Sequence, residues 1–123
     1  MKSILAVPLL GLVVIAAGCS VVVPKETRYL RSAQDHATQE EVQQQLGAPA
    51  LASSNEKGEA VWVYRVREEQ TGSRWTAPGT WCDEYVLTFD HEAVLRRWTH
   101  RSEFHGGELM PASCITGSYS STS

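Results

Sequence analysis

The side chains of this 123-residue chain that could do covalent or metal chemistry are three cysteines and four histidines. They are Cys19, Cys82, Cys114, His36, His91, His100 and His105. No two of the histidines have the i, i+4 spacing, or the closely spaced thiols, of a zinc site. No pattern marks an activating base for a cysteine nucleophile. We therefore expect no metal site, no cofactor, no small-molecule substrate and no enzymatic activity.

Cys19 follows a segment typical of exported proteins. After a short positive start, Ile4–Ala17 is an unbroken apolar run, and small residues separate it from the cysteine. This order predicts a secretory signal peptide over 1–18. The four residues that end at Cys19 resemble a bacterial lipobox, although Ala16 stands where Leu is usual. In that motif the cysteine is acylated and becomes the new N-terminus.

Lipidation of Cys19 would fix where the protein acts. Each buried methylene of an acyl chain contributes about 0.8 kcal/mol, so two or three chains hold a protein on a membrane almost permanently. Ser20 is not the Asp typical of inner-membrane retention, so we expect an outer-membrane protein facing the periplasm, with 19–25 as its tether. The alternative is an uncleaved anchor over Ile4–Val23. The basic residues from Lys25 onward would then favour a cytoplasmic domain.

With Cys19 assigned to lipid, Cys82 and Cys114 remain as an even pair. Exported cysteines with an available partner are normally oxidised, so we expect a disulfide between them. Removing 1–18 removes only Lys2 among the charged residues. The chain then has 10 Lys and Arg against 14 Asp and Glu, a formal charge of −4. This balance argues against nucleic acid as a partner.

A short helix from Thr38 to Leu46 is the best-marked element. Thr38 and Glu41 have the spacing of a capping box, and Val42 and Leu46 lie one turn apart on one face. Gly47 can adopt the left-handed conformation that ends a helix. A helix this short is unstable alone in water, so we expect it to pack on a sheet.

The rest of the domain predicts a first helix and three strands. We expect the helix over Glu26–Asp35, strands over Ala60–Glu69, Cys82–Asp90 and Val94–Arg101, and loops over Leu51–Glu59 and Thr71–Trp81. In the first strand, residues 60, 62, 64 and 66 share one face. The fold class is therefore α+β: two short N-terminal helices packed on a three-stranded antiparallel β-meander over 26–105. A flexible tail is expected over 106–123.

The last hairpin leaves two registers open. If Ala93 is left-handed, it costs roughly 1–2 kcal/mol relative to an allowed conformation. If the turn instead has two central residues, Phe89 faces Val94. The choice decides whether Leu95 or Trp98 is buried.

The order T-x-x-E-V-x-x-x-L-G-x-P from Thr38, a connection and W-x-Y resembles the SmpA/OmlA (BamE-like) family of small bacterial outer-membrane lipoproteins. The hairpin F-D-x-x-x-V-L also resembles it, although Ala93 stands where the family usually has Gly. The resemblance covers Thr38–Trp98, roughly half of the chain. It implies a non-enzymatic scaffold or adaptor that assists the assembly of β-barrel outer-membrane proteins or envelope integrity. The alternative is a periplasmic protein-binding module or an inhibitor of a secreted enzyme.

Five residues are candidates for contact with a protein partner. Trp75 lies in a Pro/Gly loop where no periodicity explains an indole, so it is either an exposed anchor or a lid on the core. Arg65, Arg67, Arg96 and Arg97 lie on two strands. They form either a basic strip on the sheet face away from the helices or scattered solubilising charge. We expect Trp75 and these arginines to form the partner site.

Overall fold

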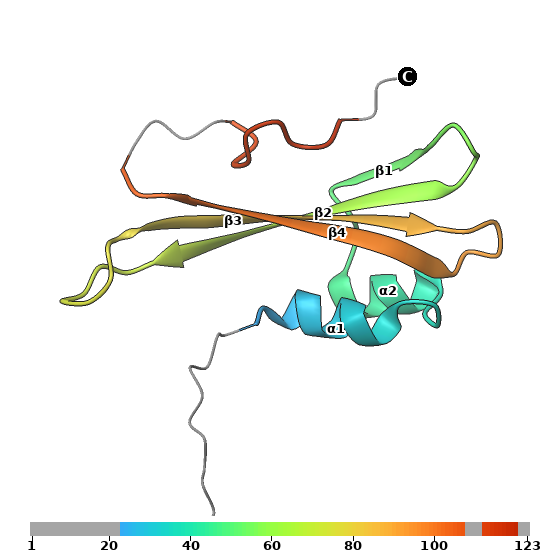
Figure 1. Ribbon diagram of the computed structural model, residues 1–123, viewed down its shortest axis with the longest axis horizontal. Coiled ribbons are helices and arrows are strands. Elements are labelled where there is room, and N and C mark those ends of the chain that lie inside the picture. The colour runs from blue at the N-terminus through green and yellow to red at the C-terminus, as the bar shows by residue number, and fades with distance from the viewer. Residues whose placement is uncertain (1–22, 108–111, 121–123) are drawn as a thin grey trace, which may run out of the picture.

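The computed structural model describes residues 23–107 and 112–120. The expected signal peptide over 1–18 and the acylated Cys19 lie outside these residues, as does most of the tether. The described elements are α1 (Lys25–Ala33), α2 (Gln39–Leu46), β1 (Leu51–Ser54), β2 (Ala60–Gln70), β3 (Gly79–Phe89) and β4 (Leu95–His105). Both helices lie on one face of an antiparallel sheet with the order β1-β2-β3-β4 (Figure 1). No helix in this part of the chain is long and apolar enough to cross a membrane.

The α+β class is confirmed, but the three-stranded meander is wrong, because the sheet has four strands. The additional strand, β1, lies in the segment expected to be a loop over 51–59. The side chain of Asn55 explains it: its Oδ1 accepts hydrogen bonds from the backbone N–H of Lys57 (3.0 Å) and Glu59 (2.9 Å). This tight turn folds β1 back onto β2, with Leu51 opposite Val63.

The capped helix forms as the sequence predicts. The Thr38 hydroxyl accepts a hydrogen bond from the Glu41 N–H at 3.3 Å, and α2 ends at Leu46, directly before Gly47, whose φ is 81°. The Tyr64 hydroxyl donates to the Gly47 carbonyl at 2.9 Å and so ties the end of the helix to β2. The first helix is shorter than expected and ends at Ala33, because Gln34 leaves the helical conformation with a ψ of 133°, and Asp35 then adopts a left-handed φ of 67°.

The β3–β4 hairpin has a left-handed Ala93, with a φ of 64°. The turn is held by Asp90, whose Oδ1 accepts from the N–H of Glu92 (2.8 Å) and Val94 (3.0 Å). A register shift after Thr88 places Phe89 opposite Leu95. Leu95 is therefore the fully buried residue, and the turn with two central residues is not formed.

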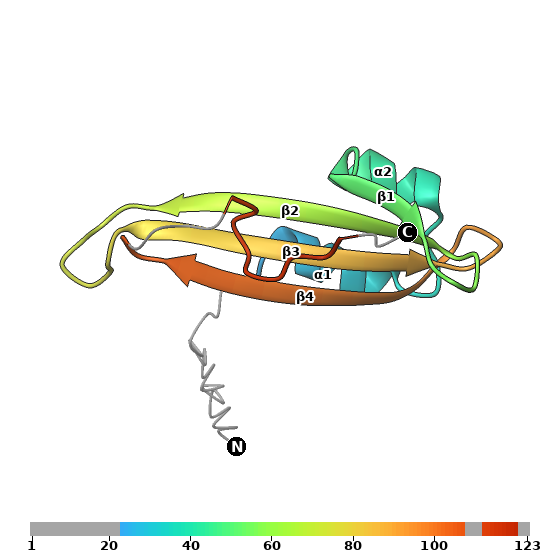
Figure 2. The same cartoon turned by 90° about the horizontal axis from the view of Figure 1, so that it is seen from above.

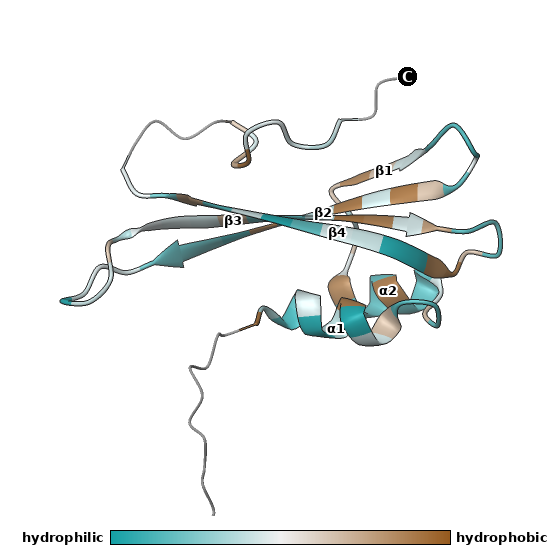
Figure 3. Ribbon diagram, viewed as in Figure 1, coloured by the Kyte–Doolittle hydropathy of each residue, from teal (hydrophilic) through white to brown (hydrophobic). Residues whose placement is uncertain are grey.

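The core lies between the helices and one end of the sheet. Its fully buried members are Leu30, Val42, Tyr85, Leu87, Phe89 and Leu95. As predicted, residues 60, 62, 64 and 66 of β2 face this core. The hydroxyl of Thr27 in α1 and that of Tyr85 in β3 are hydrogen-bonded at 2.9 Å. In Figure 3, β2 is brown above the helices and teal toward the β2–β3 loop, so the apolar content of the strand ends where the helices end.

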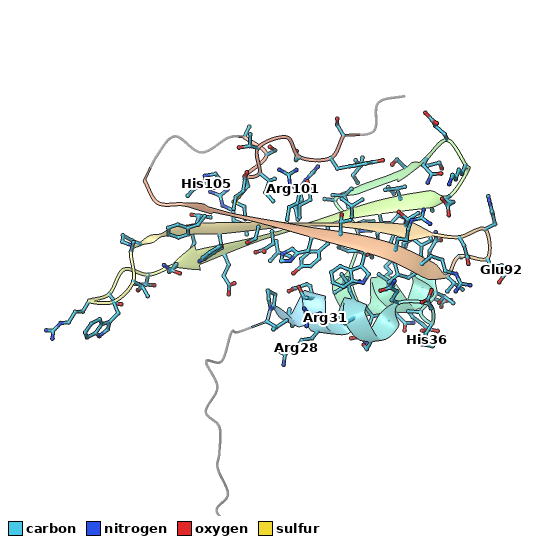
Figure 4. All side chains as sticks on the ribbon, viewed as in Figure 1. Arg28, Arg31, His36, Glu92, Arg101 and His105 are labelled. Atoms are coloured by element: carbon cyan, nitrogen blue, oxygen red, sulfur yellow. A yellow bond between two sulfur atoms is a disulfide. The ribbon has the colours of Figure 1, made fainter. Side chains whose placement is uncertain are left out.

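The opposite face of the sheet is covered by residues 112–120, which we call the C-terminal strap (Figures 1 and 2). The predicted disulfide between Cys82 and Cys114 is confirmed. Arg101 donates to the carbonyls of Thr116 (2.6 Å) and Gly117 (2.9 Å), and the N–H of Tyr119 donates to Glu84 (3.1 Å). Figure 4 shows Arg101 on this face. The expected tail over 106–123 thus includes a segment bound to the sheet, and this face is not left open.

Candidate protein-binding face

The sheet face that carries the helices continues beyond them. Past the row that contains Tyr85, two more rows cross β2, β3 and β4. They consist of Val66, Asp83 and Ser102, followed by Glu68, Trp81 and Phe104. These six residues point to the helix side, because side chains alternate between the faces of a strand. We call them the open end of the sheet.

An aromatic pair forms the outer row of the open end. The rings of Trp81 and Phe104 have centroids 5.0 Å apart, and Trp81 is 39% exposed. The indole N–H of Trp81 donates to the side-chain oxygen of Gln70 at 2.9 Å, which orients the ring. A Cβ at Gly79 would lie 2.6 Å from the backbone carbonyl oxygen of His105 and 2.5 Å from Phe104 Cζ, so the close approach of β4 favours glycine here.

A groove of about 460 Å³ runs between the open end and the start of α1. Its lining residues are Pro24, Glu68, Glu69, Gln70, Trp81, Asp83, His100 and Ser102. Glu68 and Asp83 are carboxylates on the helix side of the sheet, the Glu69 carboxylate contacts Arg67 and Thr80 on the other face, and none of the lining residues is Lys or Arg. The groove is therefore an acidic site with an aromatic wall.

One polar pair in the groove is connected to the core. His100 Nε2 and Asp83 Oδ1 are 2.7 Å apart. The imidazole of His100 stacks on the ring of Tyr85, with centroids 4.3 Å apart and planes 3° apart. Burial raises the pKa of the Tyr85 hydroxyl, which is hydrogen-bonded to the hydroxyl of Thr27. The Asp83 carboxylate thus has a position defined by the core.

Trp75 is exposed rather than folded onto the core: 88% of its surface is accessible. Its loop contains a hydrogen-bonded turn, in which Ser73 Oγ accepts from the N–H of Trp75 (3.2 Å) and Thr76 (3.1 Å). At the base of the loop, Gln70 donates to the Ala77 carbonyl at 2.6 Å. The same Gln70 side chain accepts a hydrogen bond from the Trp81 indole, so Gln70 connects the Trp75 loop to the wall of the groove.

The four candidate arginines do not form a strip. Each lies next to its own carboxylate: Arg65 by Glu84 (3.4 Å), Arg67 by Glu69 (3.8 Å), Arg96 by Asp90 (2.6 Å) and Arg97 by Glu59 (3.0 Å). Arg65 also donates to the Tyr119 carbonyl of the strap at 2.9 Å. Arg96 occupies the irregularity of β4 and contacts Asp35, at the other end of the sheet. The structure therefore does not bring these arginines together with Trp75.

The groove residues Trp81, Asp83 and His100, and the neighbouring Phe104, are not predicted as a site by the sequence. The sequence contains one signal for this part of the site. Residues 85 and 83 of β3 point to the helix side, and the same alternation continues to residue 81, in the segment predicted to be a loop. In the same way β4 continues to His105, beyond the expected end at Arg101. Within residues 23–107 and 112–120, no group of three or more His, Cys, Asp or Glu side chains is placed to hold a metal ion.

A scan against protein-family models and searches among curated proteins and solved structures found no match to this chain. The class of this protein is therefore described from its fold and from the geometry of the candidate site. It is a small, disulfide-linked α+β domain with a helix-covered core and, next to it, an exposed aromatic and acidic end of the sheet.

Proposed function

We propose that this protein is a non-enzymatic scaffold or adaptor, anchored to the outer membrane through lipid on Cys19 and facing the periplasm. It contacts an envelope protein through Trp75 and the open end of the sheet. The exposure of Trp75 carries this proposal, because a large indole on a structured loop is the kind of side chain that dominates binding at protein interfaces.

Two further observations support the location and the task. The disulfide between Cys82 and Cys114 fits an oxidising compartment such as the periplasm. The resemblance of Thr38–Trp98 to SmpA/OmlA lipoproteins favours a partner in β-barrel assembly or envelope integrity. The candidate arginines have a smaller part in this proposal than Trp75, since their charges are already balanced by neighbouring carboxylates.

The loop geometry favours a second candidate function, a periplasmic binding module that inhibits a secreted enzyme. The turn around Ser73 orders the backbone next to Trp75 before any partner arrives. Such ordering lowers the entropic cost of binding and is a common property of inhibitor loops.

The first experiment tests the anchor. Mass spectrometry of the protein extracted from membranes should find a chain that begins at acylated Cys19. The Cys19→Ser variant should lose the lipid mass and leave the membrane fraction. A chain that retains residues 1–18 would contradict the lipoprotein proposal.

The second experiment tests the binding face. The tagged protein is purified from detergent-solubilised envelopes, as the native chain, as Trp75→Ala and as Lys57→Ala, an exposed control at the other end of the sheet. Trp75→Ala should weaken capture of the partner at least tenfold and leave Tm unchanged, because the indole has no packing role. Barrel-assembly components among the captured proteins support the adaptor, and a soluble hydrolase supports the inhibitor. Equal capture by all three proteins would exclude Trp75 from the site.

A further inference from the structure

We propose that the groove of the open end binds an arginine or lysine side chain of the partner protein. This inference rests on the proposed function and specifies the chemistry of its partner. The cationic group would lie between Glu68 and Asp83, against the ring of Trp81.

The charges around the groove support a cationic occupant. Glu68 is exposed and has no ion pair within the part of the chain that the structure describes. Glu69 is 3.8 Å from Arg67 and accepts a hydrogen bond from Thr80, and Asp83 contacts His100. Glu68 is therefore the groove carboxylate available to a cation, and Lys25 and Arg28 line the adjoining groove that shares Pro24 and Glu68.

The aromatic wall suits the same occupant. The N–H of Trp81 is already bound to Gln70, so the indole offers a partner its ring surface and not its donor. Phe104 packs against the same ring and limits its movement. Guanidinium and ammonium groups are attracted to the face of an indole, while their aliphatic stems pack on apolar walls such as Pro24. An arginine can also make paired hydrogen bonds with a carboxylate.

The groove needs little rearrangement to bind. Its volume of about 460 Å³ lies within the range of roughly 300–1,000 Å³ typical of ligand pockets. Stacking on Tyr85 holds His100, and His100 in turn holds Asp83. The position of the groove next to the Trp75 loop favours a protein segment as occupant. One chain could place an apolar residue against Trp75 and a cationic residue in the groove.

The test uses the mature protein in detergent and two peptides, Ac-Gly-Leu-Arg-Leu-Arg-Gly-NH₂ and the same peptide with both arginines replaced by citrulline. Citrulline keeps the shape of arginine and removes its charge. In an NMR titration, the arginine peptide should shift the indole N–H signal of Trp81, identified with the Trp81→Phe variant. The citrulline peptide should bind at least fivefold more weakly.

Two variants of equal charge locate the interaction. Glu68→Gln should weaken the binding of the arginine peptide at least threefold, whereas Glu56→Gln, in the β1–β2 turn, should leave it unchanged. Both side chains are exposed, so neither variant should alter Tm. Equal binding of the two peptides, or equal effects of the two variants, would overturn the inference. Competition by phosphoethanolamine at the affinity of the peptide would also overturn it, since the groove would then recognise a lipid headgroup.

The outcomes separate this inference from the proposed function. If the arginine peptide fails to bind while Trp75→Ala still weakens partner capture, the groove assignment is wrong and the adaptor proposal stands. If Trp75→Ala has no effect on capture while Glu68→Gln weakens peptide binding, the groove is a cation site and the proposed interface is wrong.

Discussion

The two ends of the helix-bearing sheet face are built from the same three strands and differ in what covers them. Under the helices, the row of Trp62, Leu87 and Trp98 contributes to the core, and Leu87 is fully buried. In the outer row, which includes Trp81, the ring is 39% exposed. The alternation of side chains is identical at both ends. What differs is the layer above them: no helix covers the outer row of the open end, Glu68, Trp81 and Phe104, whereas Val66 in the inner row still packs against the core.

We expect the covered end of the sheet to contribute more to the free energy of unfolding than the open end, because the covered end buries more apolar side chains. A fully buried Leu or Phe side chain contributes about 1.5–3 kcal/mol through the removal of its surface from water. The open end has few such contributions on its helix side. It is held instead by the strand pairing and, on the other face, by the disulfide and hydrogen bonds of the C-terminal strap.

The sharpest test of this contrast is a truncation at each end. Leu87→Ala removes a fully buried side chain and should lower the free energy of unfolding by about 2–5 kcal/mol. Chemical denaturation monitored by circular dichroism would measure it. Trp75→Ala, which removes a larger side chain beyond the open end, is the control and should change stability little. Similar losses in the two variants would mean that the open end is also part of the core.

The second test removes the covalent link of the open end. Cys82 and Cys114 are separated by 32 residues, and closing such a loop stabilises a fold by roughly 3–4 kcal/mol in the chain-entropy model. The double variant with alanine at both positions should lose about this much. Hydrogen exchange should accelerate in residues 80–84 and 101–105 more than around Leu87. Uniform acceleration along β3 would contradict an independent open end.

The smallest expected effect concerns the turn at the covered end. Because Ala93 has a φ of 64°, Ala93→Gly should relieve strain and stabilise the protein by about 0.5 kcal/mol after the entropy of glycine is counted. The same substitution at the exposed Ala52 of β1 should destabilise it. Thermal unfolding of both variants measures the difference, and a lower Tm for Ala93→Gly would argue against a strained turn.

Local signals were enough to predict much of the covered end. The spacing of Thr38 and Glu41 predicted the start of α2, Gly47 its end, and alternation the core face of β2. Such features depend on residues that are neighbours in sequence. By contrast, β1 has the sequence Leu-Ala-Ser-Ser, which carries little strand preference, and it forms because the turn at Asn55 returns the chain onto β2.

The candidate site was harder to predict because its parts come from distant segments. The groove combines the start of α1 with strand ends where polar residues such as Asp83 and Ser102 interrupt the apolar side of the alternation. The strap has a low-complexity sequence. Only the predicted disulfide between Cys82 and Cys114 indicated that this segment is attached to the sheet. The partner role of the candidate arginines stays a prediction: Arg65 and Arg96 share a sheet, but each forms an ion pair with a different acid.

The position of Pro24 in the groove wall has a consequence for how a partner is found. Five residue steps separate it from Cys19, and extended chain of that length spans at most about 18 Å. With lipid on Cys19, the groove would search a thin layer next to the membrane instead of the whole compartment. A partner confined to the same layer is met at a high effective concentration. A contact too weak to join two dissolved proteins could therefore be sufficient at this surface.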